Sequence, residues 1–258
     1  MRRLLALAAA AAAIGVAAAV PAGLDDNPAV RHDRFGCVVA TDTLTPVVHL
    51  VFSADSMFEG APTAIDAMRR RGVRASFFFT GNFLRDSAND AVVRRIIADG
   101  HYVGPHSDRH LLLADWDGRR TTLVSADSLL RDLDRNYAEL QRHGVSRSDA
   151  RIALPPYEWC NAMQAAAYRS AGVTPVNPTP EIETYRDYTL PGMPEYKTSA
   201  EMLGQLYAYE RARGLNGAII ILHLGTRDER TDKLYDHLGA IIDTLTVRGY
   251  RFATLYGQ

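Results

Sequence analysis

The chain has 258 residues, 47% of them hydrophobic and 23% charged, and a formal net charge of −1 at pH 7. This composition predicts one large α/β domain, or two small ones, with a substantial core. Without the first 22 residues, 27 basic and 30 acidic residues remain, a formal charge of −3. Such a surface does not attract nucleic acid or an anionic membrane, so we expect neither as a partner.

The N-terminus has the three parts of a secretory signal peptide. Two arginines precede an Ala/Leu/Val run to Val20, and Pro21-Ala22-Gly23 supplies small residues at a cleavage point. We expect residues 1–22 to be removed and the protein to be exported, to the periplasm or outside the cell. The alternative is an uncleaved anchor, because the run is nearly long enough to span a bilayer. In an oxidising compartment Cys37 and Cys160 could form a disulfide or remain two buried thiols.

Apolar runs and capping signals predict strands alternating with helices along the mature chain. Residues 23–46 form a lead-in with a short first strand, and residues 47–258 form one catalytic domain without a linker. Strands are predicted at 37–40, 47–52, 74–79, 101–104, 151–154, 173–176, 217–222 and 250–255. Helices are predicted at 61–71, 87–99, 125–142, 161–171, 198–211 and 231–247. Capping boxes are predicted at Ser87–Asp90 and Thr198–Glu201, and a long irregular loop at 177–197.

This alternation predicts a parallel sheet covered by helices. About seven units without a glycine-rich phosphate loop favour a closed or nearly closed barrel over a dinucleotide-binding sheet. In such barrels the chemistry lies at the carboxyl ends of the strands. Asp55, His106, the Pro155-Pro156-Tyr157 segment and His223 all follow predicted strands, so we expect them to meet.

His106 and His110 lie four residues apart, immediately after a predicted strand. One helical turn or a tight loop brings such a pair onto one face. Two neutral imidazoles and a carboxylate leave a fourth position of a zinc-like ion open for water. The alternative is a capping or core histidine at His106 and a solvated one at His110. The polar residues Asp55 and His223, each following an apolar run, favour the metal site.

The order of motifs resembles that of the polysaccharide deacetylases of carbohydrate esterase family 4, the NodB-like deacetylases. The resemblance extends from about Val47 to Tyr256. His106-Ser107-Asp108-Arg109-His110 matches the metal-binding H-S/T-x-x-H motif of the family. Three weaker matches support it, at Val73–Gly81, Leu154–Tyr157 (R-x-P-Y in the family) and Leu222–Gly225 (L-x-H or L-H).

The resemblance implies a distorted (β/α)7 barrel and metal-assisted hydrolysis of an N- or O-acetyl group on a glycan, with metal-bound water attacking the carbonyl. It implies Asp55, His106 and His110 as ligands of a divalent metal, with zinc preferred, and His223 as the catalytic acid. An acetylated glycan is the expected substrate. We expect a monomer that makes no membrane contact after cleavage.

Two departures from the family pattern concern the catalytic base. The T-F-D-D motif is replaced by Val51-Phe52-Ser53-Ala54-Asp55, with one Asp that comes one or two positions late. Leu154 replaces the arginine that steadies the base. The general base could therefore be Glu59, Glu158 or Asp187, and each of these could instead be a solvated surface carboxylate. Asp187 could also orient His223, and Asp55 could be the base itself.

Aromatic faces bind sugar rings, and several aromatic residues fall in loops beside these motifs. The tyrosine of the Pro-Pro-Tyr segment could also help to hold the oxyanion. The candidates for substrate binding are Pro156, Tyr157, Trp159, Trp116 and Tyr188. Each could equally be ordinary loop packing.

Three functions are compatible with these residues. The first is an exported glycan deacetylase. The second is a pseudo-deacetylase that binds glycan without turnover, and the missing Asp of the family motif favours it. The third is a metal hydrolase of another amide or ester. Retention of both metal-site histidines and of His223 favours the first function, because a protein that only binds needs no catalytic acid.

Overall fold

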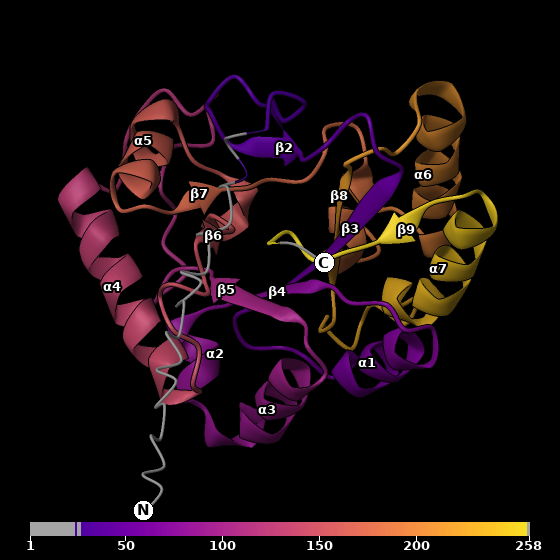
Figure 1. Cartoon of the computed structure of the whole chain (residues 1–258), viewed down its shortest axis with the longest axis horizontal. Helices are drawn as coiled ribbons and strands as arrows, with labels where there is room; N and C mark the ends of the chain where they lie inside the picture. The colour runs from indigo at the N-terminus through magenta and orange to yellow at the C-terminus, as the bar shows by residue number, and fades with distance from the viewer. Residues whose placement is uncertain (1–23, 25–26, 257–258) are drawn as a thin grey trace, which may run out of the picture.

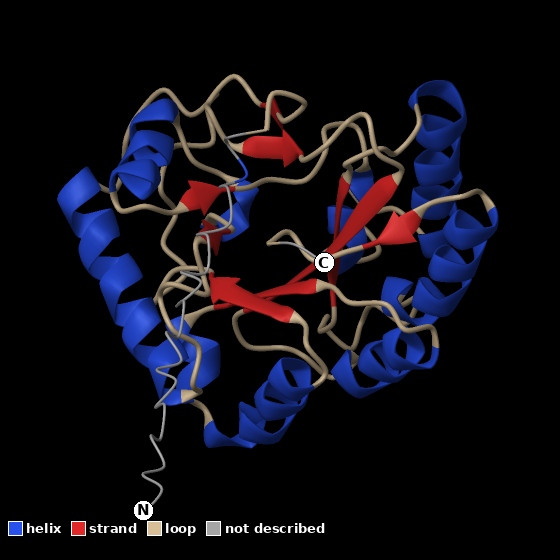
Figure 2. Cartoon of the chain, viewed as in Figure 1, coloured by secondary structure: helices blue, strands red, loops and turns tan. Residues whose placement is uncertain are grey.

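The computed structural model describes residue 24 and residues 27–256 (Figures 1 and 2). The predicted signal peptide, residues 1–22, lies outside the described residues. The strands are β1 (Arg31–His32), β2 (Val38–Ala40), β3 (Val47–Ala54), β4 (Ser76–Phe79), β5 (Tyr102–Pro105), β6 (Ile152–Ala153), β7 (Thr174–Pro175), β8 (Ile219–His223) and β9 (Arg251–Phe252). The α-helices are α1 (Ala61–Arg70), α2 (Gly81–Arg85), α3 (Asp90–Ala98), α4 (Ala126–Arg142), α5 (Ala162–Ser170), α6 (Ser199–Arg213) and α7 (Leu238–Val247).

The strands form a ring with the helices outside it (Figure 1). Strands β5, β4, β3 and β8 make one parallel sheet in that order, and β6 and β7 make a separate parallel pair. Three short links join these pieces. Leu154 N donates to the carbonyl of Pro105 at 3.2 Å, and isolated bridges pair Val38 with Val176 and Ala40 with Ala218. The predicted distorted (β/α)7 barrel is therefore confirmed.

Alternation along the strands separates two apolar clusters. Phe52, Phe77 and Leu222 belong to the large cluster that also contains the buried faces of the helices. Val51 and Phe78 belong to a smaller cluster that draws on the strands and their ends, so it fills the inside of the ring. Successive side chains of a strand point to opposite faces, so every second residue points into the barrel. Where this alternation continues past the ends of the strands, it brings polar residues to one mouth of the barrel.

Most helix boundaries follow from capping residues. The predicted capping box at Thr198 and Glu201 is confirmed, with the Thr198 hydroxyl accepting from Glu201 N and the Glu201 carboxyl accepting from Thr198 N. The predicted box at Ser87 is wrong. Asp86 accepts from the backbone N of Ala88 and starts a 3₁₀ turn over Ser87–Asn89, and α3 begins after it without a side-chain cap.

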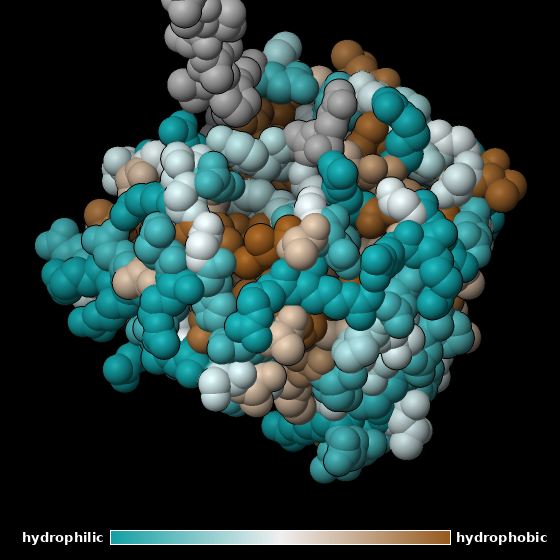
Figure 3. Space-filling model, turned by 60° about the horizontal axis from the view of Figure 1, so that its bottom comes forward, coloured by the Kyte–Doolittle hydropathy of each residue, from teal (hydrophilic) through white to brown (hydrophobic). Residues whose placement is uncertain are grey.

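The surface has mixed polarity. The face in Figure 3 is largely hydrophilic, with hydrophobic residues gathered toward its middle. Over the described part of the chain, no helix combines the length and the apolar character needed to cross a bilayer. The two cysteines are buried and form no disulfide, and their sulfur atoms share a hydrogen bond at 3.2 Å.

Candidate active site

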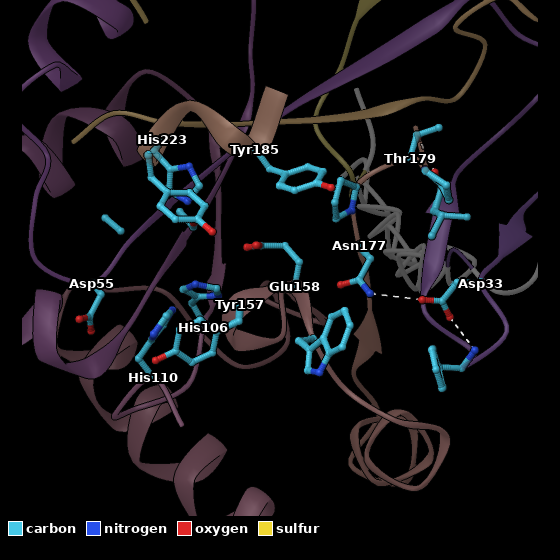
Figure 4. Close-up of a pocket in the computed structure, with 18 of the residues that line it drawn as sticks. Asp33, Asp55, His106, His110, Tyr157, Glu158, Asn177, Thr179, Tyr185 and His223 are labelled. Atoms are coloured by element: carbon cyan, nitrogen blue, oxygen red, sulfur yellow. Dashed lines mark hydrogen bonds between the residues drawn. The ribbon is translucent and has the colours of Figure 1, made fainter. Parts of the chain in front are cut away.

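A cavity of about 810 Å³ opens at the carboxyl ends of the strands (Figure 4). Three of the residues that line it share one origin, since Asp55, His106 and His223 each end or directly follow a barrel strand. Strand register accounts for their meeting. Ser53 of β3 lies opposite His223 of β8, and the next inward positions along β3 and β5 are Asp55 and His106.

His106 is buried and held in one tautomer. Its Nδ1 lies 2.8 Å from the carbonyl oxygen of Leu154, and a carbonyl only accepts, so Nδ1 carries the proton. Its backbone N donates to the side chain of Asn136 at 2.9 Å. Burial, and then the neighbouring His110, lower the pKa of His106 well below its usual value. In the neutral ring Nε2 therefore carries no proton and can serve as a metal ligand.

His110 lies beside His106 in a loop rather than on a helix. Its backbone φ is 53°, in the left-handed region, and its ring centroid is 5.0 Å from that of His106. Two imidazoles bound tetrahedrally to one zinc ion at about 2.1 Å have centroids roughly 5 Å apart. Burial lowers the pKa of His110, although the charge of Asp55 opposes this. The pair is therefore neutral and spaced as a shared ion requires.

The carboxyl group of Asp55 is bound to the protein instead. Its Oδ1 accepts from Thr80 Oγ1 at 2.9 Å and from Asn82 Nδ2 at 3.1 Å. Across the described residues, no three His, Cys, Asp or Glu side chains are gathered closely enough to hold an ion. The donor types and the histidine spacing fit a divalent metal, but Asp55 is not drawn in as a third ligand.

His223 and Asp187 form a tightly bonded pair. His223 Nδ1 lies 2.6 Å from Asp187 Oδ1, and the backbone N of His223 donates to the other carboxyl oxygen at 2.7 Å. Asp187 comes from the 3₁₀ helix η4 (Glu183–Tyr188), inside the predicted irregular loop, and is buried. Burial alone would lower the pKa of His223, but the charge and hydrogen bond of Asp187 outweigh it and raise that pKa.

Glu158 occupies the middle of the cavity. It belongs to the 3₁₀ helix η3 (Pro156–Glu158), and both Tyr157 and Glu158 have positive φ, 59° and 52°. Such backbone costs about 1–3 kcal/mol per residue and clusters at functional sites. The carboxyl group points toward His106 and His223 (Figure 4). Burial raises its pKa to about 7, although the charge of His223 opposes the shift.

The structure does not bring Glu59, the other base candidate, to the cavity. Its carboxyl oxygen accepts from Thr226 N at 2.9 Å, from Lys233 Nζ at 3.3 Å and from the Tyr235 hydroxyl at 3.3 Å. Burial opposes this effect, but these bonds keep the pKa of Glu59 below its usual value. Glu59 therefore joins two loops and is not among the residues that line the cavity.

Four of the five predicted sugar contacts line the cavity. Trp116 and Tyr188 are the most exposed, at 58% and 54%, and Tyr157 and Trp159 stand beside them. Pro156 is buried under the loop and does not line the cavity.

The sequence prediction omitted further lining residues, among them Asp33, Phe35, Arg119, Asn177 and Tyr185. One of them could have been predicted from the sequence. Asn177 directly follows a predicted strand, the same pattern that identified Asp55 and His223.

Comparison with known proteins identifies the family. The polysaccharide deacetylase family model matches residues 40–176, more than half of the chain. A chitin deacetylase of Colletotrichum lindemuthianum is 26% identical over 243 residues, covering 92% of this chain and 90% of that protein. The peptidoglycan-N-acetylmuramic acid deacetylase PdaA of Bacillus subtilis is 22% identical over 227 residues, covering 86% and 75%.

Solved structures share the fold. A carbohydrate esterase family 4 pseudoenzyme from Bacillus anthracis superposes with a TM-score of 0.65 at 15% identity, covering 86% of this chain and 68% of that one. A family 4 acetyl xylan esterase from Clostridium thermocellum, in complex with a cobalt ion, gives 0.63 at 22% identity, covering 81% and 88%. The chain therefore belongs to the polysaccharide deacetylase family, hydrolases that act on carbon–nitrogen bonds other than peptide bonds.

Proposed function

We propose that this protein is an exported, divalent-metal-dependent deacetylase that removes acetyl groups from a glycan. The observation that supports this function most strongly is the pairing of two proton-transfer groups across one cavity. Glu158 has a pKa of about 7, and His223 has a pKa raised by Asp187. Between them they can take one proton and give another near neutral pH.

We assign Glu158 the role of general base. The family motif that supplies this group is replaced by Ser53 and Ala54, and the carboxyl group of Glu158 reaches the same cavity from a different loop. Because its pKa lies near neutrality, it is ionised in part of the molecules and still basic enough to accept a proton from water.

We assign His223 the role of general acid. The hydrogen bond from Nδ1 to Asp187 fixes the ring and stabilises its protonated form. Nε2 is then the atom that can deliver a proton to the departing amine or alkoxide. Asp187 acts through His223 and is a positioning residue.

The residues that would hold the metal are His106 and His110, with Asp55 as the third ligand once its carboxyl group turns from Thr80 and Asn82 toward the ion, and zinc is the first choice. A bound divalent ion would lower the pKa of its water to about 7 and polarise the acetyl carbonyl. Nε2 of His106 is already free of a proton, so binding requires no deprotonation there. The relative that holds cobalt supports testing cobalt alongside zinc.

The relatives and the N-terminus support proposals for the substrate and the location. The names of the relatives cover chitin, peptidoglycan and acetylated xylan, so the acetyl group removed could be N-linked or O-linked. The signal-peptide pattern supports export, and we expect the mature protein to be a monomer.

The test is release of acetate from N- and O-acetylated glycans by the mature, metal-loaded protein. We expect release that is lost in Glu158→Gln and in His106→Ala, with zinc retained only in the first variant. Unchanged release in Glu158→Gln would exclude that residue as the base. Release that persists without metal would exclude metal dependence.

A second candidate is a glycan-binding pseudo-deacetylase. Ser53 and Ala54 in place of the carboxylates of the family favour it, and one structural relative is described as a pseudoenzyme. Asp55→Ala separates the two functions. A binding protein with an idle metal keeps its glycan affinity in this variant, whereas an enzyme loses metal and turnover together.

A further inference from the structure

The cavity extends well past the reacting groups. In Figure 4 Glu158 stands in the middle, with the three labelled histidines and Asp55 on one side and Asn177, Thr179 and Asp33 on the other. The second half takes no part in the chemistry described above. Its walls come from the segment before β2 and the segment after β7.

Asn177 presents an unpaired acceptor to this half. The side chain is 4% exposed, and its Nδ2 donates to Asp33 Oδ2 at 3.3 Å. A carboxylate only accepts, so the amide orientation is fixed with Nδ2 toward Asp33. The amide oxygen then points toward Glu158 (Figure 4) and has no hydrogen-bond partner among the described residues. A buried acceptor left unpaired is costly unless a ligand supplies the donor.

Both carboxyl oxygens of Asp33 are engaged within the protein. Its Oδ1 accepts from the backbone N of Phe35 and of Cys37, both at 2.9 Å, while Oδ2 faces Asn177 and lies 3.8 Å from Arg119. The negative charge of Asp33 is therefore countered within the protein. Arg34 also lines the cavity, with its guanidinium 4.7 Å from the centroid of the Phe35 ring, so a positive charge lies beside the uncharged acceptor of Asn177.

An aromatic wall completes this half. The guanidinium of Arg119 lies between the rings of Phe35 and Trp159, 4.5 Å and 3.8 Å from their centroids. Trp159 is fixed further by donating from Nε1 to the carbonyl of Asp115 at 2.9 Å. Rigid aromatic side chains beside a buried acceptor are the features of a small-molecule site with fixed orientation.

We propose that Asn177 is a specificity-determining residue of this half of the cavity, where its Oδ1 accepts a hydrogen bond from a hydroxyl of the sugar residue next to the acetylated one. The proposal rests on the deacetylase function proposed above and names the substrate as an oligosaccharide whose second sugar residue offers a hydroxyl to Asn177. A free acetylated monosaccharide would leave Asn177 unpaired.

The test is calorimetric binding of cellobiose and xylobiose, which carry no acetyl group, to the zinc-loaded mature protein. We expect Asn177→Ala to weaken binding about tenfold, the loss of one hydrogen bond. The matched control is Thr184→Val, which removes another buried unpaired polar atom outside the cavity and should not change binding.

Three outcomes overturn the subsite: no binding of either disaccharide to the wild type, equal binding by wild type and Asn177→Ala, or an equal loss in Thr184→Val. Acetate release measured on the same samples is independent of these results. Acetate release together with disaccharide binding that does not depend on Asn177 would contradict the subsite alone. Disaccharide binding that depends on Asn177, without acetate release, would support the subsite and contradict the deacetylase function.

Discussion

Replacing Glu158 by glutamine should make the protein more stable and less active at the same time. The pKa of Glu158 is raised from 4.5 to about 7, so its charged form is disfavoured in the folded state. The stability that uncharged Glu158 contributes is therefore fully present below pH 4.5 and is lost as the pH rises through about 7. At 1.36 kcal/mol per pKa unit the loss is at most ~3 kcal/mol, and solvent at the mouth of the cavity reduces it.

Glutamine carries no charge at any pH and avoids this loss. Above about pH 7, Glu158→Gln should unfold at higher urea concentration than the wild type, and near pH 4.5 the two should coincide. Removing the base should lower the rate of acetate release by about 10²–10⁴-fold. Urea unfolding followed by circular dichroism at several pH values measures the first effect, and enzymatic acetate detection the second.

Glu59→Gln is the matched control, because the pKa of Glu59 is shifted the opposite way. A lowered pKa gives stability that is present above pH 4.5 and lost as the pH falls, so this variant should be less stable at neutral pH. If Glu158→Gln and the wild type lose stability in parallel as the pH rises, Glu158 is not a desolvated carboxyl. Its assignment as the base would then lose its physical support.

Further predictions concern the other groups of the site and the cysteines. His106→Ala should lose stoichiometric zinc, as measured by metal analysis of the dialysed protein, and full retention would contradict its role as a ligand. In an active enzyme, Asp187→Asn should move the alkaline limb of the pH–rate profile to lower pH, because the main group that raises the pKa of His223 is lost; an unmoved limb would show that His223 is not the acid. The contact with Cys160 and burial raise the pKa of Cys37, so under reducing conditions iodoacetamide should modify it far more slowly in the folded protein than in urea. Equal rates would contradict the burial seen in the structure.

The barrel and half of the site could be predicted because both follow from short-range patterns. Apolar runs mark the strands, and polar residues that follow them lie at the carboxyl ends, where such barrels carry their chemistry. This pattern predicts that Asp55, His106 and His223 meet, and the structure brings all three to one cavity.

The remaining features depend on contacts that no local pattern encodes. From the sequence, Glu158 is one of three candidates for the base, and its place in the cavity depends on two successive residues with positive φ, a conformation that neither Tyr nor Glu favours. Asp33 meets Asn177 across 144 residues of sequence. Helix α2 has five residues and is too short to show a helical period, and the Ser87 cap failed because Asp86 accepts the backbone bond instead.

The two-residue period of a strand relates Asp55 to the first carboxylate that is missing at the end of β3. Ser53 faces the cavity opposite His223, and Asp55 reaches the same cavity two residues later. An acidic residue at position 53 or at position 55 therefore keeps the same face of the strand, with a displacement of roughly 6.6 Å between the two. A carboxylate at position 55 in place of one at position 53 stays in the cavity but lies beyond the level of His223 along the barrel.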